Sequence, residues 1–298
     1  MEKIGRRKFI AAAAAAALFR PLSAPAVARK NMAGPREVRR ALGNSASGLP
    51  LVNASAPMAE GAAGGAAALS AMDSSGISAA VMSAPDARSR AAFSDSRLAE
   101  ALNSAHSAAC SASPERLKFA ALLPLCGGWE AEFSRASGLP GFAGVVLPAA
   151  PLESLLPPME RAASEGVPVF FTPSGPSRGA AFCDAETAAF ASEACGGGFP
   201  DGLACVLPDM GGSILFSLAR RGGAPFPGFY FSAGQSPFPA GLFGEVGGRV
   251  PRSAILFGSG AETPVAAAVK NLEAMGLSEG AFKAACHVNA CRLFGFGL

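Results

Sequence analysis

Histidine, cysteine and the carboxylates are the side chains that most often hold metals or act as acids, bases and nucleophiles. This chain has two histidines, His106 and His287, so a multi-histidine metal site and a Ser/His/Asp or Cys/His triad are not expected. His106 falls in a predicted helix beside serines, where a surface or capping histidine is expected. Cys286, His287 and Cys291 share one predicted helix, but positions one and five apart do not converge on one face, which favours packing over metal binding.

The seven cysteines show no CxxC spacing, and an odd number cannot pair completely. Most are therefore expected to be small buried residues. Cys183 with Cys195 is the one candidate disulfide, in an oxidising compartment.

A helix, a tight turn and a buried strand can be placed between residues 151 and 176. Apolar residues at helical spacing predict a helix over 155–163, with Pro157 and Pro158 in its first turns, where a missing N–H costs least. After a glycine stop, the apolar run 167–171 predicts a parallel strand buried on both faces. Ligands of parallel sheets bind at the carboxyl ends of the strands, so the chemistry is sought there.

The same alternation of strand and helix extends over most of the chain. Further strands are predicted at 77–82, 117–123, 142–147, 203–207, 229–232 and 254–257. Helices are predicted at 35–43, 66–72, 96–109, 129–136, 179–194, 213–220, 265–275 and 279–294, the last with Ser278 as its N-cap. Such alternation favours a (β/α)8 TIM-like barrel over an open doubly wound sheet.

The first strand of this barrel is the weakest part of the pattern. It should precede Pro35 or lie near residues 49–52. Because the residues before Glu60 are small and have low strand propensity, we expect the first strand to be incomplete.

Polar residues at the predicted strand ends are the candidates for a site. Asp209 follows one strand and Glu262 lies in the loop after the last, so both are placed at the barrel mouth. They can hold a substrate or one weakly bound cation, and a solvated loop acid is the ordinary alternative. Arg178 with its loop amides is a candidate anion site. Runs of glycine at 196–198 and 211–212 lack the frame of a phosphate loop and indicate turns.

The N-terminus resembles an export signal. Its charged residues are followed by a short apolar run over 9–19 and by the small-residue cleavage site Ala26-Val27-Ala28. The phrase Arg6-Arg7-Lys8-Phe9-Ile10 resembles the twin-arginine consensus, with a general secretory signal as the alternative. The sequence therefore predicts a signal peptide over 1–28, a barrel domain over 29–298, and export by the twin-arginine translocation machinery to the periplasm or medium. Eleven apolar residues are fewer than the ~20 that span a bilayer, so no membrane anchor is expected.

The basic charge of the chain belongs to this signal. Residues 1–28 contain five basic side chains and one acidic one, so their removal takes the formal net charge from +3 to −1. Without a basic stripe on the remaining domain, a nucleic-acid partner is not expected.

Several strand-end phrases resemble the amidohydrolase-related family of metal-dependent barrels, which includes aminocarboxymuconate-semialdehyde decarboxylase-like enzymes. Met72-Asp73-Ser74-Ser75-Gly76-Ile77 is similar to the family's M-D-E-A-G-I. The segment 114–125 is similar to its P-x-R-F…A-x-x-P-L, and Gly141-Phe142-Ala143-Gly144-Val145 to its G-F-x-G-V. The terminal phrase Asn289-Ala290-Cys291-Arg292-Leu293-Phe294-Gly295 is similar to N-A-x-R-L-F-G. The order of these phrases over residues 72–295 implies the family's barrel.

The resemblance implies a divalent metal at the strand ends, but the family's ligands are missing from the matching phrases. A His-x-His pair should end the first strand, and the nearby phrase 30–35 contains no histidine. Thr172 stands where a histidine is expected, and Asp209-Met210-Gly211-Gly212 where the family has H-x-G-G. Gly258-Ser259-Gly260 matches its G-S-D, with Gly260 in place of the acid.

The sequence therefore predicts an exported barrel that has lost its metal centre and serves as a non-catalytic binding or vestigial protein. No metal or other cofactor is expected, and a small-molecule ligand is the candidate partner. Asp209 is the candidate catalytic residue if a hydrolase or decarboxylase activity survives without the metal. Thr172, Arg178, Ser259 and Glu262 are the pocket candidates.

Overall fold

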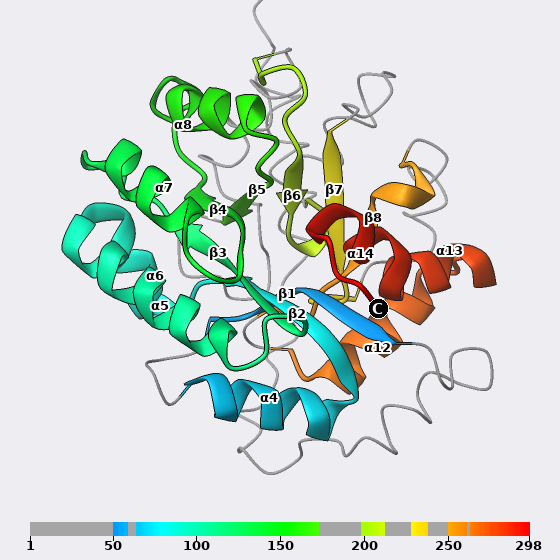
Figure 1. Cartoon of the computed structure of the whole chain (residues 1–298). Helices are drawn as coiled ribbons and strands as arrows, with labels where there is room; N and C mark the ends of the chain where they lie inside the picture. The colour runs from blue at the N-terminus through cyan, green and yellow to red at the C-terminus, as the bar shows by residue number, and fades with distance from the viewer. Residues whose placement is uncertain (1–49, 59–63, 173–197, 212–227, 238–249, 261–262) are drawn as a thin grey trace, which may run out of the picture.

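Eight parallel strands form the centre of the protein in the computed structural model, which describes residues 50–58, 64–172, 198–211, 228–237, 250–260 and 263–298. Each strand pairs with the next in sequence, giving a sheet in the order β1 to β8. The strands are β1 (Leu51–Pro57), β2 (Ile77–Ala84), β3 (Leu117–Leu122), β4 (Phe142–Pro148), β5 (Val169–Thr172), β6 (Cys205–Leu207), β7 (Phe229–Ala233) and β8 (Ile255–Phe257). Figure 1 shows helices packed around the outside of the strands. The sheet is a nearly closed (β/α)8-type barrel, as predicted.

The seven strands expected from the sequence are all confirmed, with ends shifted by at most two residues. The expectation of an incomplete first strand is wrong. β1 spans seven residues and pairs in parallel with β2, and its residues are buried except Pro57. Small, low-propensity residues form a strand here because β2 and the packed barrel supply the pairing and the burial that the local sequence does not.

The helices follow the predicted pattern within the described residues. They are α4 (Gly64–Ser75), α5 (Ala87–Ala91), α6 (Ser96–Ser111), α7 (Trp129–Ser137), α8 (Leu152–Ser164), α12 (Val265–Ala274), α13 (Glu279–Lys283) and α14 (Asn289–Phe294). No helix among these residues is long and apolar enough to span a bilayer. The predicted helices over 35–43, 179–194 and 213–220 and the candidate disulfide Cys183–Cys195 lie outside the described residues.

The helix α8 begins three residues earlier than predicted, at Leu152. Pro157 and Pro158 therefore stand inside the helix, where each lacks the N–H that would bond to the preceding turn. Pro158 is buried on the same face as Met159. Packing against the barrel thus holds the helix despite the missing hydrogen bonds.

His106 lies in α6 and is 1% exposed, with its ring 6.2 Å from that of Phe119. The expected surface or capping histidine is therefore a buried one. Its helix begins at the N-cap Asp95, whose carboxylate accepts hydrogen bonds from the N–H groups of Arg97 and Leu98. His106 packs between α6 and β3, away from the carboxyl ends of the strands.

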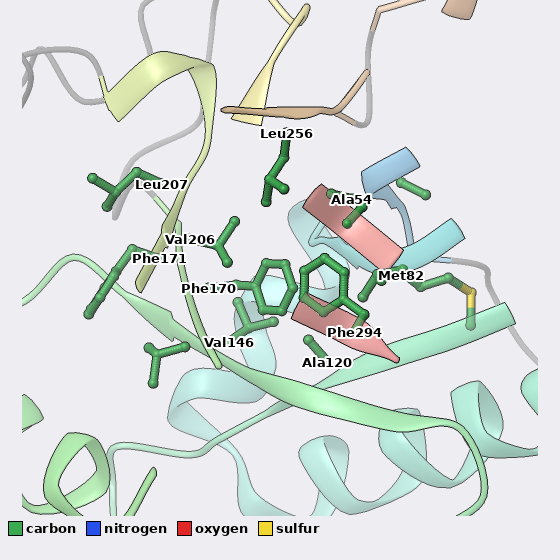
Figure 2. Packing of buried hydrophobic residues seen from close by; sticks show 14 of the residues in the cluster. Ala54, Met82, Ala120, Val146, Phe170, Phe171, Val206, Leu207, Leu256 and Phe294 are labelled. Carbon is green, nitrogen blue, oxygen red and sulfur yellow. The ribbon is translucent and has the colours of Figure 1, made fainter. Parts of the chain in front are cut away.

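Aromatic and aliphatic side chains from both faces of the strands build the core. Figure 2 shows Val146, Phe170 and Val206 gathered around Phe294, while Phe171 and Leu207 point to the other side of the strands. The alternation is that of parallel strands covered on both faces. Phe294 comes from α14 and stacks on Phe170, with ring centroids 5.5 Å apart.

Three matching residues of the C-terminal phrase that resembles the family, Asn289, Phe294 and Gly295, have structural roles. The Asn289 side chain donates to the carbonyl oxygens of Arg252 and Ile255, both at 2.8 Å, at the start of β8. Phe294 fills the barrel interior, and Gly295 ends the helix with a left-handed φ of 66°. The phrase therefore reflects the docking of the last helix on the amino ends of the strands.

Candidate functional site at the strand ends

Asn53 joins β1 to the loop that follows β8. Its Nδ2 donates to Ser259 Oγ at 2.9 Å, and the Ser259 N–H donates to Asn53 Oδ1 at 3.2 Å. The Gly260 N–H donates to the carbonyl oxygen of Ser55 at 2.8 Å. Asn53 and Ser259 are 1% and 3% exposed. These hydrogen bonds close the barrel between the first and last strands of the sheet.

Gln235, two residues past the end of β7, completes this corner. Its Nε2 donates to Ser55 Oγ at 3.2 Å, and its backbone carbonyl accepts from the Thr263 hydroxyl at 2.7 Å. We call Asn53, Ser55, Gln235, Ser259 and Thr263 the seam network. All five side chains are neutral amides or hydroxyls.

A side chain at position 260 would overlap with the side chain of Gln235. A Cβ on Gly260 would lie 2.7 Å from Gln235 Cδ, and Gly260 has a left-handed φ of 64°. Any side chain at this position would therefore both strain the backbone and displace Gln235. In the family that the sequence resembles, this is the position of an acid.

A buried hydroxyl, that of Ser232, lies close to the seam network. Ser232 lies in β7 and is 0% exposed, and its Oγ has no hydrogen-bond partner among the described residues. It lies 2.0 Å from the place where a Cβ of Gly258 would be, and Ser55 Cβ lies 2.9 Å from that same place. The missing side chain of Gly258 thus leaves room for the hydroxyl. A buried hydroxyl without a partner is costly, which makes Ser232 a candidate for contact with a ligand at this corner.

Two predicted site residues lie at other strand ends. Thr172 is the last residue of β5, is 4% exposed, and accepts a hydrogen bond at its carbonyl from the Ala149 N–H at 2.7 Å. Asp209 begins the short 3-10 turn Asp209–Gly211 after β6, in which Met210 has a φ of 57°. Arg178 and Glu262 lie outside the described residues.

Of the predicted residues, the structure brings Ser259 into the seam network. Thr172 ends β5, which β6 and β7 separate from β8 in the sheet. The structure also places the first strand at Leu51–Pro57, so the phrase 30–35 does not end it. Asn53-Ala54-Ser55 lies inside β1, two residues before its end, and its two polar residues have the spacing of the expected His-x-His.

Asn53, Ser55, Gln235 and Ser232 were missed by sequence reasoning. The signal for the first two was the alternation of polar residues directly after the apolar pair Leu51-Val52. Gln235 and Ser232 carried no such signal, because their contacts are with residues about 180 and 26 positions away along the chain.

Known structures share this barrel. No protein-family model matches the chain, and no curated protein matches it in sequence. A 2,6-dihydroxybenzoate decarboxylase in complex with 2,6-dihydroxybenzoate matches with a TM-score of 0.62 and 21% identity, over 76% of this chain and 87% of that one. The 5-carboxyvanillate decarboxylase of Sphingomonas paucimobilis gives 0.58 and 19%, over 76% and 82%. A dihydroxybenzoic acid decarboxylase from Polaromonas, with bound manganese and 2-nitroresorcinol, gives 0.60 and 19%, over 78% and 86%.

The chain has the fold of the amidohydrolase-type decarboxylases. At these identities the likeness concerns the fold alone. It agrees with the resemblance of the phrases between residues 72 and 295.

The seam network does not fit the metal that this fold implies. A catalytic transition metal needs about three strong ligands, usually imidazole or carboxylate. Within the described residues no group of three or more His, Cys, Asp or Glu side chains could hold a metal ion. The two histidines of the chain lie in α6 and in the C-terminal helices, and neither is at a strand end. Neutral amides and hydroxyls stand where the family's ligands are expected.

One pair of metal-binding residue types does meet elsewhere in the structure. His287 Nδ1 and Cys291 Sγ lie 3.4 Å apart in the C-terminal helices. The expectation that the residues of this helix do not converge is wrong for this pair, because the two residues are four positions apart and share a helix face.

Proposed function

We propose that this protein is a barrel of amidohydrolase ancestry, without the catalytic metal at its strand ends, that binds a small hydroxylated molecule without converting it. The observation that carries the proposal is the seam network, in which Asn53 and Ser55 have the spacing of the His-x-His pair expected in the first strand. Beside it, Gly260 stands where the resembling phrase of the family has an acid. This site is hydrogen-bonded internally and carries no charge. Lewis-acid chemistry therefore has no support from the residues at this corner.

The chemistry of the corner suits an uncharged ligand. Amides and hydroxyls offer both donors and acceptors, which match the hydroxyl groups of a neutral molecule. The buried Ser232 hydroxyl supplies a further donor that no described side chain uses. A carboxylate would need a charged partner, and burying it beside neutral groups is unfavourable. Proteins of the same fold named above act on hydroxylated aromatic acids, so a ring diol is the first ligand class to test.

The test compares two molecules that differ by one carboxylate, resorcinol and 2,6-dihydroxybenzoate. Titration calorimetry should show that resorcinol binds at least as tightly as 2,6-dihydroxybenzoate, and no carbon dioxide should be released from the acid. Ser232→Ala should weaken the binding of resorcinol by about five- to tenfold, the value of one neutral hydrogen bond. Tighter binding of the acid, or its decarboxylation, would contradict the proposal.

The absence of a metal from the strand ends is tested separately. Protein grown with added zinc and manganese, desalted and analysed by elemental mass spectrometry, should hold far less than one equivalent of metal in the Cys291→Ser variant. That variant lacks the Cys291 thiol, so metal bound by the His287–Cys291 pair does not contribute to the measured metal content. A chelator should leave its melting temperature unchanged. A stoichiometric metal that survives desalting in this variant would overturn the proposal.

Residual catalysis is the alternative that the same assay detects. If 2,6-dihydroxybenzoate were turned over, Asp209→Asn would identify the acid proposed from the sequence: loss of turnover with unchanged melting would assign the reaction to Asp209.

We also propose that the protein is exported. The support is the twin-arginine phrase and the alanine-rich run in residues 1–28, which lie outside the described residues. The partner in export is the twin-arginine translocation machinery, and the destination is the periplasm or medium.

A further inference from the structure

A thiol and an imidazole lie in contact in the C-terminal helices. His287 belongs to a π-helical segment, Ala284–Val288, and Cys291 to α14. Their Sγ and Nδ1 atoms are 3.4 Å apart, and both residues are half-buried. Cys291 is a free cysteine. The pair thus presents two metal-binding atoms at one partly open spot.

The helix that carries this pair is held firmly on the barrel. Asn289 is bonded through its side chain to two carbonyl oxygens at the start of β8. Phe294 stacks on Phe170, and the Lys118 ammonium donates to the carbonyl oxygens of Phe294 and Gly295. In Figure 1 the red C-terminal helices lie beside β1 and β8. The pair therefore lies on an anchored helix near the amino ends of the strands, away from the seam network.

The helix changes type in the segment that contains His287. The Asn289 N–H donates to the carbonyl oxygen of Ala284, five residues back, instead of four. Such a π-turn inserts one residue into the helix and rotates the side chains before it relative to those after it, and π-turns occur often at functional sites. Here the turn ends at Asn289, the residue whose side chain bonds to the start of β8.

The pair is not built as a reactive thiolate. Burial raises the pKa of the Cys291 thiol, against the smaller opposing effect of a hydrogen bond from the Leu298 backbone. A protonated thiol is a weak nucleophile. A metal ion, however, displaces the thiol proton on binding, so a raised pKa makes metal binding pH-dependent without preventing it.

The distance between the two atoms suits a tetrahedral ion. Zinc–sulfur and zinc–nitrogen bonds of about 2.3 and 2.1 Å at a tetrahedral angle place the two ligand atoms about 3.6 Å apart. The observed distance of 3.4 Å is close to this value. The geometry points to a site for a zinc-like divalent ion held by His287 Nδ1 and Cys291 Sγ, with water in the remaining positions. This site does not rest on the proposed function.

Cobalt(II) is the probe, because it takes zinc sites and its thiolate complexes absorb in the near ultraviolet. Titrating the full chain with Co²⁺ should produce a thiolate-to-cobalt band that saturates near one equivalent and disappears on addition of Zn²⁺. Cys291→Ser should abolish the band, and His287→Ala should weaken Co²⁺ binding by about tenfold or more. Cys126→Ser, which removes an exposed free thiol in the loop after β3, is the matched control and should leave the band unchanged.

A second measurement needs no variant. Zn²⁺ should slow the alkylation of Cys291 by iodoacetamide several-fold, measured by peptide mass spectrometry, while Cys126 in the same sample reacts at an unchanged rate. No cobalt band in the wild-type protein, a band that survives Cys291→Ser, or equal effects of zinc on both cysteines would overturn the proposal.

Discussion

Asn53 and Ser259 are 206 positions apart in the chain and are joined by a 2.9 Å hydrogen bond from Asn53 Nδ2 to Ser259 Oγ. The bond closes the barrel between its first and last strands at the place where the fold's metal ligands are expected. The same carboxamide accepts hydrogen bonds from the N–H groups of Ser55 and Ser259. A residue type that binds no transition metal tightly has thus become part of the barrel's closure.

Asn53→Ala should destabilise the protein through this closure. The change leaves the buried N–H groups of Ser55 and Ser259 without their acceptor, and we expect the free energy of unfolding to fall by about 1–3 kcal/mol. Urea unfolding followed by circular dichroism measures the change. Ser137→Ala, which removes an exposed hydroxyl that donates within its own helix, should shift the free energy by less than about 0.5 kcal/mol. Equal effects of the two changes would refute the structural role of Asn53.

Gly260→Asp should be costly, although it restores the acid of the family's phrase. The new side chain combines a left-handed φ with a collision against Gln235, for an expected loss of about 2–4 kcal/mol. Gly276→Asp is the matched control, because Gly276 has a φ of 70° and open space around it. It should lose about 1–2 kcal/mol from backbone strain alone.

The double variant Gly260→Asp/Gln235→Ala tests whether Gln235 is the cause. Removing the Gln235 side chain should recover about 1 kcal/mol or more relative to additive behaviour. Strictly additive losses in chemical denaturation would show that the collision is absent.

Alkaline pH should destabilise the protein through its buried thiols. Burial raises the pKa of Cys110 from 9.0 to about 12, so between these values the folded chain keeps a proton that the unfolded chain releases. The stabilisation is therefore complete below pH 9 and is lost as the pH rises toward 12, at about 1.4 kcal/mol per pH unit for this thiol. Burial raises the pKa of Cys286 to about 12 as well.

Cys110→Ala isolates the contribution of one thiol to this slope. Under reducing conditions the free energy of unfolding of the variant should fall less steeply above pH 9 than that of the wild type. At neutral pH the variant should lose about 1 kcal/mol, from the small cavity that replaces the sulfur. Parallel curves for the two proteins between pH 9 and 11 would contradict the assignment, and Cys126→Ala serves as the exposed-thiol control.

Arg6→Lys with Arg7→Lys should trap the precursor in the cytoplasm. The paired arginines ahead of Phe9 and the alanine-rich run are the basis of this prediction. Fractionation with an antibody against the barrel domain measures it. A double variant that is still exported and trimmed near Ala28 would show a general secretory route instead.

The sequence by itself determined the barrel, because each strand-and-helix unit is a local pattern. Strands β2 and β5 form where the apolar runs near Ile77 and Val169 predict them. Ser278 caps its helix as expected, because its side chain accepts a hydrogen bond from the Ala281 N–H. The residue count carried one further conclusion: a chain with two histidines cannot supply the family's multi-histidine ligand set, wherever they lie. These conclusions needed composition and short-range periodicity alone.

Tertiary structure decided the first strand and the content of the site. Leu51–Pro57 has weak strand propensity and forms a strand because β2 pairs with it and the barrel buries it. The pairing of Asn53 with Ser259, the place of Gln235 beside Gly260, and the buried Ser232 hydroxyl all depend on contacts between distant parts of the chain. Local sequence patterns do not predict such contacts, since they arise when parallel strands bring their carboxyl ends to one edge of the barrel. The π-turn that ends in the Asn289 N–H bond to Ala284 is likewise seen only in the structure, whereas the contact of His287 with Cys291 follows from their spacing of four residues.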